Sequence, residues 1–126
     1  MVSLDHVIVF SASGAPEAGA LVRLGLAEGQ PNTHPGQGTS NRRFFFQNAY
    51  LELLWVSDPM EARSESVRRT QLWGRWGGRH SSACPFGVVL RPLPRAQGTR
   101  LPVPTWCYRP AYLPSDRRIR VAEDVS

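Results

Sequence analysis

Glu52 is a carboxylate in the middle of the apolar stretch 49–56, which reads Ala-Tyr-Leu-Glu-Leu-Leu-Trp-Val. Aromatic and aliphatic residues bounded by turn-forming residues predict a buried β-strand. Because side chains alternate along a strand, Glu52 shares a face with Tyr50 and Leu54. Burying an unpaired carboxylate is costly, so Glu52 is expected to meet a cation, a metal ion or hydrogen-bond donors.

His6 is the second residue able to do chemistry, and it also lies in a predicted strand, 4–10. Alternation gives this strand two faces. One face carries Leu4, His6, Ile8 and Phe10, and the other carries Asp5, Val7 and Val9.

Five further residues are candidates for ligand contact, and four of them have a simpler alternative. His34 lies in the polar segment 29–41, and a solvent-exposed loop histidine is the alternative. Phe44 and Phe46 share a face of the predicted strand 42–47, where they line a cup or belong to the core. Arg91 follows an apolar strand and either binds a carboxylate or lies on the surface. Tyr50 shares the face of Glu52 and is the fifth candidate.

The elements that position these residues indicate an α+β fold. Residues 1–57 are predicted to follow a β-α-β-β-β order, with a short helix near 16–25. Leu21 and Val22 of this helix are expected to pack against the strand faces that carry Val7, Val9, Leu51, Leu53 and Trp55. Asp58-Pro59 begins a predicted helix that runs to about Trp76. The remaining predicted strands are 84–90, 106–108 and 118–121.

Composition excludes several classes of protein. The chain has 126 residues and a net charge of +5, and all fifteen basic residues are arginine. They are scattered along the sequence, which favours a codon bias typical of a GC-rich bacterium over a nucleic-acid-binding patch. We find no membrane-spanning run and no signal peptide, so we expect a cytoplasmic protein. Cys84 and Cys107 are expected to be buried and unpaired.

Six short motifs follow one another along most of the chain. They are 4–7 (Leu-Asp-His-Val), 34–41 (His-Pro-Gly-Gln-Gly-Thr-Ser-Asn), 50–53 (Tyr-Leu-Glu-Leu), Trp73 with Trp76, 85–87 (Pro-Phe-Gly) and 106–114 (Trp-Cys-Tyr-Arg-Pro-Ala-Tyr-Leu-Pro). Together they make the chain similar to the glyoxalase-like domains of the vicinal oxygen chelate superfamily, which includes glyoxalases, bleomycin-resistance proteins and extradiol dioxygenases.

The resemblance implies a curved mixed sheet built from βαβββ modules around a cupped site. It divides the chain into a complete module at 1–57, a connecting helix at 58–80 and a reduced second module at 81–126. It also places the first and fourth strands of the module side by side, with His6 and Glu52 as ligands of Zn, Ni, Fe, Mn or Mg. Glu52 would then be the catalytic residue.

The second module departs from the family pattern. Its strand carries Phe86 or Gly87 where a second metal-binding histidine is expected, and only Glu123 offers a late carboxylate. A metal site would need a further ligand from His34, His80, a second subunit or the substrate. The alternative is a metal-free His6–Glu52 ion pair.

Two functions follow from this reading. One is a metal-assisted lyase, isomerase or dioxygenase that acts on a small organic molecule. The other is a metal-free protein of the bleomycin-resistance type that binds or sequesters its ligand. Nucleic-acid binding is a distant third hypothesis. We also predict a homodimer, because a reduced second module leaves apolar surface for a symmetric partner to cover.

Overall fold

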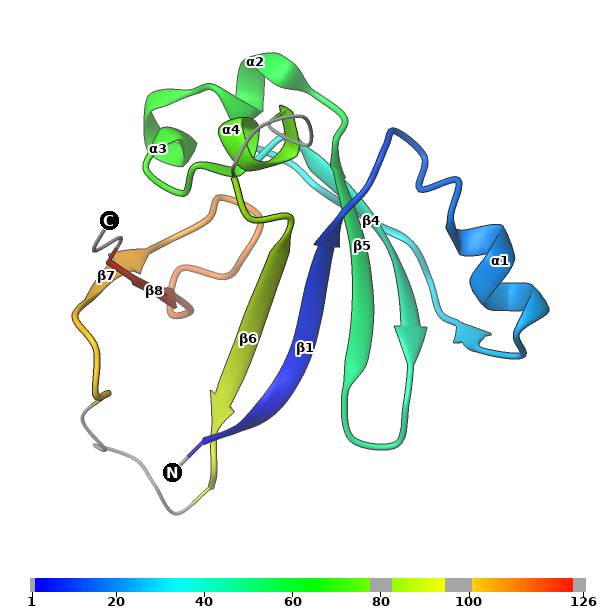
Figure 1. Cartoon of the computed structure of the whole chain (residues 1–126). Helices are drawn as coiled ribbons and strands as arrows, with labels where there is room; N and C mark the ends of the chain where they lie inside the picture. The colour runs from blue at the N-terminus through cyan, green and yellow to red at the C-terminus, as the bar shows by residue number, and fades with distance from the viewer. Residues whose placement is uncertain (1, 78–82, 95–100, 124–126) are drawn as a thin grey trace.

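The computed structural model describes residues 2–77, 83–94 and 101–123, and its main element is a curved mixed sheet (Figure 1). Its strands lie in the order β2-β4-β5-β1-β6, and β3 also pairs with β4. The bounds are β1 (Val2–Phe10), β2 (Ala27–Glu28), β3 (Asn32–His34), β4 (Thr39–Phe45), β5 (Tyr50–Val56) and β6 (Phe86–Pro92). This arrangement confirms the predicted α+β, glyoxalase-like fold.

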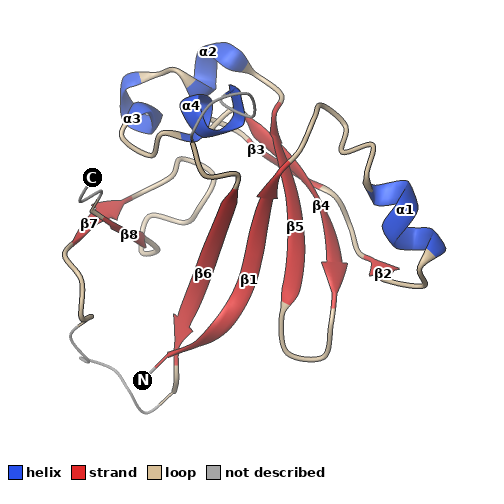
Figure 2. Cartoon of the chain, viewed as in Figure 1, coloured by secondary structure: helices blue, strands red, loops and turns tan. Residues whose placement is uncertain are grey.

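The remaining elements are short. Four helices and a separate two-stranded ribbon complete the described chain: α1 (Ala18–Arg23), α2 (Pro59–Ala62), α3 (Glu65–Arg68), α4 (Leu72–Gly77), β7 (Thr105–Tyr108) and β8 (Ile119–Ala122). Helices α2 to α4 gather at one end of the sheet, and α1 lies at the side away from β6 (Figure 2). Within the described residues, no helix is long and apolar enough to cross a membrane.

The core lies between α1 and one face of the sheet. Ala15 and Ala18 from the α1 region pack with Phe44 and Leu53, and Val9, Leu21, Leu51 and Trp55 surround them. The predicted packing of Leu21 against the odd-numbered face of β1 and β5 is therefore confirmed. Val22 was expected in the same contact but is exposed, because the short helix turns it outward.

The predicted helix over 58–76 is wrong, because three helices occupy this segment. Asp58 does form the expected cap: its side chain accepts from the backbone N–H groups of Met60 and Glu61. The helix then breaks at Ser64, which has extended backbone geometry, and at Gln71, which has φ 60°. Neither conformation continues an α-helix.

Two smaller expectations also need correction. The segment 29–41 is not a continuous loop, because Asn32 and His34 lie in β3, which pairs with β4. Cys84 and Cys107 are both free, as expected, but they are exposed rather than buried. The module boundaries at 57 and 80 stay a prediction, and His80 lies outside the described residues.

Candidate functional site

Glu52 and His6 lie on adjacent strands and on the same face of the sheet. Strands β1 and β5 run parallel, with His6 beside Tyr50 and Ile8 beside Glu52. Glu52 is only 7% exposed. Its Oε1 atom lies 3.7 Å from Nε2 of His6. The predicted partner of the buried carboxylate is therefore in place, although this distance is too long for a direct hydrogen bond.

A second side chain satisfies the other oxygen of Glu52. Asn41, which is buried on β4, donates from Nδ2 to Oε2 of Glu52 at 2.5 Å. The amide oxygen of Asn41 accepts from the backbone N–H of Asn32 at 2.9 Å. Asn41 therefore holds the backbone of β3 and also fixes the plane of the Glu52 carboxylate.

Asp5 orients His6 from the opposite side. Its Oδ2 atom lies 2.6 Å from Nδ1 of His6. Because a carboxylate only accepts hydrogen bonds, Nδ1 carries a proton and donates it to Asp5. Nε2 is then the ring nitrogen that faces Oε1 of Glu52. The sequence reading placed Asp5 on the other face; a register shift between Leu4 and His6 in the β1–β6 pairing disturbs the alternation there.

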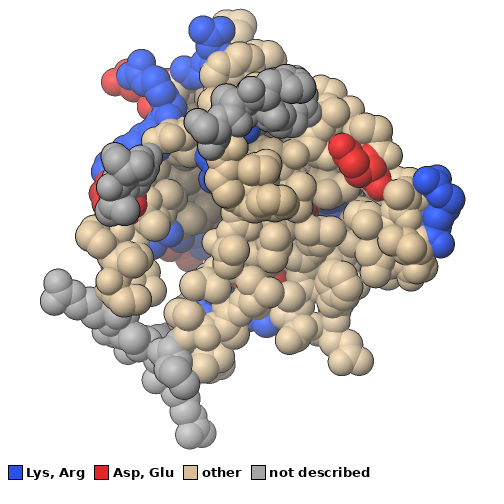
Figure 3. Space-filling model, in the orientation of Figure 1, with Lys and Arg blue, Asp and Glu red and all other residues tan. Residues whose placement is uncertain are grey.

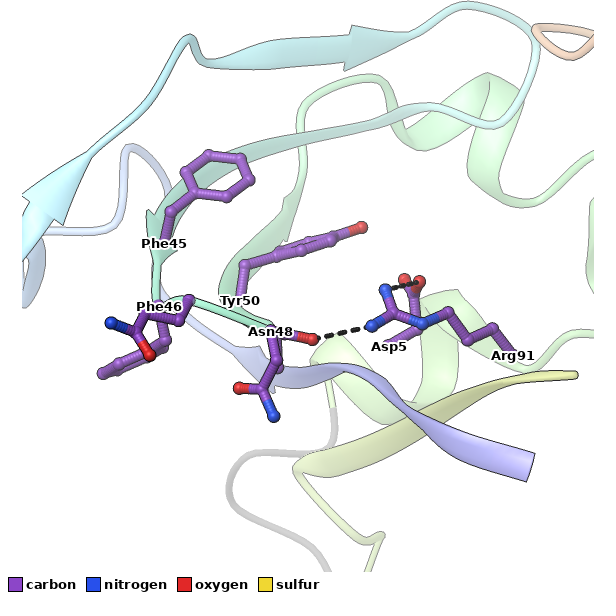
Figure 4. A pocket seen from close by; sticks show the side chains of 8 residues that line it. Asp5, Phe45, Phe46, Asn48, Tyr50 and Arg91 are labelled. Atoms are coloured by element: carbon purple, nitrogen blue, oxygen red, sulfur yellow. Dashed lines mark hydrogen bonds and ion pairs between the residues drawn. The ribbon is translucent and has the colours of Figure 1, made fainter. Parts of the chain in front are cut away.

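Arg91 extends this chain of polar contacts to the surface. Its Nη1 atom donates to Oδ1 of Asp5 at 3.3 Å, and its Nη2 donates to the backbone oxygen of Asn48 at 2.9 Å. The guanidinium thereby joins β6 to the β4–β5 hairpin (Figure 4). Side chains thus connect Arg91, Asp5, His6, Glu52 and Asn41 in a single line across four strands.

Beside Arg91 lies a hollow of about 220 Å³ at the end of the hairpin. It is lined by Asp5, Phe45, Phe46, Gln47, Asn48, Ala49, Tyr50 and Arg91. Three of the five predicted ligand-contact residues, Phe46, Tyr50 and Arg91, therefore come together in one place. The lining of the hollow combines aromatic surface with one cation and one anion.

Tyr50 connects the hollow to the His6–Glu52 pair. Its ring stacks on His6 with centroids 4.3 Å apart and an interplanar angle of 10°. The Arg43 guanidinium lies 5.7 Å from the centre of the Tyr50 ring. Burial, followed by the charges of Glu52 and Asp5, raises the pKa of Tyr50 to about 12. Tyr50 is consequently a neutral hydroxyl group at physiological pH.

A second group of polar side chains lies at the β3–β4 turn. Nδ1 of His34 is 2.8 Å from Oγ1 of Thr39, and the His34 ring lies 4.7 Å from that of Tyr112. Gln37 donates to the same Thr39 oxygen and accepts from the Tyr108 hydroxyl. The C-terminal segment therefore closes over this end of the sheet.

Electrostatics link this group to Glu52. Burial lowers the pKa of His34, while the charge of Glu52 acts in the opposite direction. Burial and then the charge of Glu52 raise the pKa of Tyr112 to about 12. His34 is thus a partly buried residue of a strand, near the carboxylate, rather than an exposed loop histidine.

Phe44 is the predicted ligand-contact residue that the structure places elsewhere. It is fully buried against the α1 region on the opposite face of the sheet, so it has no surface to offer a ligand. Asp5, Gln37 and Tyr112 were missed as site residues. The adjacency of an acid to His6 was a usable signal for Asp5, whereas Gln37 and Tyr112 are brought together only by the fold.

These features define a class of protein: a curved mixed sheet with a helix after its first strand that carries a histidine–carboxylate pair on one face and an aromatic hollow beside it. The family model of the glyoxalase-like domain matches residues 4–109, and the chain belongs to this family, within the vicinal oxygen chelate superfamily. Comparison with curated proteins and with solved structures gives no match. Membership in this family supports a role in binding or converting a small molecule.

The donor atoms partly fit the divalent ion that this superfamily often uses. His6 presents an imidazole nitrogen backed by a carboxylate, the arrangement that orients metal-binding histidines, and Glu52 presents one oxygen beside it. Across residues 2–77, 83–94 and 101–123, however, no three His, Cys, Asp or Glu side chains are grouped to hold a metal. His6 and Glu52 thus supply two ligands, which is fewer than a protein-only site needs.

The second module does not add a ligand within the described part of the chain. Strand pairing places Gly87 beside Ile8, so Gly87, not Phe86, is the β6 position that faces the site. The Arg75 guanidinium lies 3.6 Å from where a Cβ of Gly87 would be. Glu123 pairs with Arg69 at 3.0 Å instead. A cation therefore lies near the position where the family pattern would put a second ligand.

Proposed function

We propose that this domain binds a small organic molecule on the His6–Glu52 face of the sheet, with Tyr50, Phe46 and Arg91 forming the open end of the site. The observation that carries this proposal is the orientation of the pair. Asp5 holds His6 from behind, Asn41 holds Glu52 from behind, and Nε2 of His6 and Oε1 of Glu52 face each other across 3.7 Å.

Such a pair suits one kind of ligand group. The free carboxylate oxygen of Glu52, held at this spacing from an imidazole, attracts a hydrogen-bond donor or a cationic group of the ligand. The stacked Tyr50 ring offers an apolar wall and a neutral hydroxyl next to the same point. Glu52 is also the residue placed to remove a proton from a bound ligand, because its carboxylate is buried and oriented.

Metal-assisted chemistry is the second candidate, and the Asp5–His6 contact is the observation that favours it. A divalent ion bound by His6 and Glu52 would polarise a substrate oxygen and stabilise a developing enolate. In that case Asp5 keeps Nε2 of His6 available as the ligand atom, and Asn41 leaves Oε1 of Glu52 free.

Calorimetric titration separates the two candidates. Chelator-treated protein is titrated with Zn, Ni, Mn and Mg, and a thermal-shift screen of small organic cations and hydroxylated aromatic molecules is run with and without metal. We expect ligands that stabilise the wild type and fail to stabilise Glu52→Gln. Glu65→Gln, which changes an exposed carboxylate on α3, is the matched control.

The outcomes are distinct. Ligand binding without metal supports the first candidate. Stoichiometric metal uptake that His6→Ala abolishes supports the second. If every ligand and metal binds Glu52→Gln as it binds the wild type, the site is elsewhere and the proposal fails.

A further inference from the structure

A second hollow lies between the helical end of the chain and the β7–β8 ribbon. Its volume is about 330 Å³, which is within the range of small-molecule sites. The residues that line it include Arg69, Arg75, Trp106, Val121 and Glu123. No described residue lines both this hollow and the one at the hairpin. We call the second one the ribbon hollow, and Figure 1 shows the ribbon below α3.

The break between α3 and α4 brings two arginines to the ribbon hollow. Arg69 caps the C-terminus of α3, and Arg75 lies in α4. On one continuous helix, residues six positions apart lie about 120° from each other around the axis, so they point to different faces. Gln71 adopts φ 60° between the two helices and redirects the chain. Both guanidinium groups consequently border the same hollow.

Arg75 is a half-buried cation that backbone contacts hold in place. Its Nε donates to the Cys84 carbonyl oxygen at 3.3 Å, its Nη2 donates to the Phe86 carbonyl oxygen, and its Cζ lies 4.8 Å from the centre of the Phe10 ring. Among the described residues, no carboxylate forms an ion pair with it. Burial lowers the pKa of this guanidinium, since burial disfavours the charged form. An anion from solution would supply the charge that the protein does not.

Arg69 and Trp106 form the outer part of the ribbon hollow. Cζ of Arg69 lies 4.5 Å from the centre of the Trp106 ring, and its Nη2 donates to Oε1 of Glu123 at 3.0 Å. Both members of this ion pair reach solvent, so the pair is weak and can exchange for another anion. Trp106 is paired with Val121 across the ribbon, and paired residues share a face. That face gives the hollow an apolar wall.

We propose that the ribbon hollow is a second binding site, separate from the His6–Glu52 face, and that it binds a small aromatic anion. The anionic group is a carboxylate or a phosphate, the groups that the planar donor set of arginine recognises best. It lies at the guanidinium groups of Arg69 and Arg75. The ring of the ligand lies against the wall that Trp106 and its neighbour form.

Charge favours the ribbon hollow over the hairpin hollow as the place for an anion. Two arginines and one glutamate line the ribbon hollow, whereas Arg91 and Asp5 of the hairpin hollow pair with each other at 3.3 Å. Figure 3 shows basic side chains gathered at the end of the molecule that carries α3, in contrast to the largely uncharged surface over β1 and β6. Such a distribution attracts anions to this end of the protein.

Calorimetric titration with defined probes tests the site. Phenyl phosphate and benzoate each join a ring to an anionic group, inorganic phosphate lacks the ring, and benzyl alcohol lacks the charge. We expect at least one of the two aromatic anions to bind the wild type, and the tighter one identifies the anionic group. Inorganic phosphate should bind about fivefold more weakly than phenyl phosphate, because it does not contact the apolar wall. Failure of both aromatic anions to bind would overturn the proposal, as would benzyl alcohol binding equally well.

Opposite charge changes at one ion pair give the sharpest readout. Arg69→Gln is expected to weaken the tighter-binding aromatic anion by about 10-fold. Glu123→Gln removes the carboxylate that competes for Arg69 and is expected to strengthen binding by about threefold. Arg68→Gln is the matched control, because Arg68 is an exposed arginine of α3 outside the lining. Unchanged affinity in Arg69→Gln, or weaker binding by Glu123→Gln, would overturn the proposal.

Two further variants distinguish the ribbon hollow from the proposed site on the sheet. Glu52→Gln and Arg91→Gln are both expected to bind the aromatic anion as the wild type does. Loss of binding in either variant would place the anion at the His6–Glu52 face or the hairpin hollow and would overturn the inference. If the proposed function alone fails, the affinity of the ribbon hollow and its response to Arg69→Gln stay as described.

Discussion

Nε2 of His6 faces Oε1 of Glu52 across 3.7 Å, from two strands that run parallel in the centre of the sheet. Each residue is held from its far side, His6 by Asp5 and Glu52 by Asn41. The facing atoms are therefore fixed by contacts that a bound ligand would not need to break. A site prepared in this way loses little conformational entropy when a ligand binds.

Asn41 is expected to be the most sensitive polar residue near the pair. Asn41→Ala removes a hydrogen bond to a buried carboxylate and should lower the free energy of unfolding by about 2–3 kcal/mol. Denaturant unfolding measures the change. Asn48→Ala, at an exposed hairpin position, should change it by less than about 0.5 kcal/mol. Equal effects of the two substitutions would show that the Asn41–Glu52 contact does not contribute to stability.

Phe44 and Phe46 should respond in opposite ways to truncation. Phe44→Ala opens a cavity in the core and should cost about 3–5 kcal/mol of unfolding free energy. Phe46→Ala removes a half-exposed ring and should leave stability nearly unchanged while weakening ligand binding at the hollow. Thermal unfolding and ligand titration of both variants check this. Strong destabilisation by Phe46→Ala would contradict the placement.

Alanine substitutions at Gly38 and Gly14 should separate the cost of backbone strain from the cost of steric crowding. Both have positive φ, 75° and 78°, so alanine costs about 1–2 kcal/mol of left-handed strain at either position. At Gly38 an added Cβ would also lie 2.3 Å from the Asp58 carbonyl oxygen and 2.5 Å from the Ala62 nitrogen, whereas at Gly14 it meets nothing within 4 Å. In denaturant unfolding, Gly38→Ala should therefore lower the free energy of unfolding by about 1–3 kcal/mol more than Gly14→Ala does. Similar losses would contradict the close contact.

Alkaline titration should reveal the environment of the tyrosines. The chain has three, and burial is the main cause that raises the pKa of Tyr50, Tyr108 and Tyr112 to about 12 each. Each group binds its proton more tightly in the folded state than in the unfolded state, where the pKa is about 10. The contribution of these tyrosines to the free energy of unfolding is consequently complete below pH ~10 and is lost as the pH rises from about 10 to about 12.

Phenolate absorbance followed against pH checks this expectation. The folded protein should show no phenol titrating near pH 10, and Tyr112→Phe should remove one of the late steps. Three phenols that titrate together near pH 10 in protein that is still folded would contradict it.

Alternation along the strands predicted the faces on which His6 and Glu52 lie, and the resemblance to the glyoxalase-like family supplied the adjacency of the two strands. Placing His6 on one face of β1 and Glu52 on one face of β5 requires only the twofold period of a strand. The same rule predicted the opposite packing of Val9, Leu51 and Leu53 against the α1 region, which is confirmed. These results depend on local geometry, which a single sequence carries.

The parts of the site that sequence reasoning missed depend on an irregularity in a strand and on contacts between residues that are distant in the sequence. Asp5 was placed on the wrong face, because the bulge in β1 interrupts a pattern that looks regular in the sequence. The role of Asn41 depends on the register between β4 and β5, and the Gln37–Tyr108 bond joins residues 71 positions apart. Neither relation leaves a periodic signal in the chain.

The β3–β4 turn has a consequence for how this protein can diversify. Gly38 is packed against Asp58 and Ala62, Gly36 donates its N–H to Glu61, and Gly36 also abuts Ala111. That end of the site can therefore accept few substitutions. The tip of the β4–β5 hairpin, where Phe46 is exposed, has no comparable constraint. Changes in ligand preference are expected to accumulate at the hairpin, where evolution or an engineer can alter length and sequence while the histidine–carboxylate pair stays fixed.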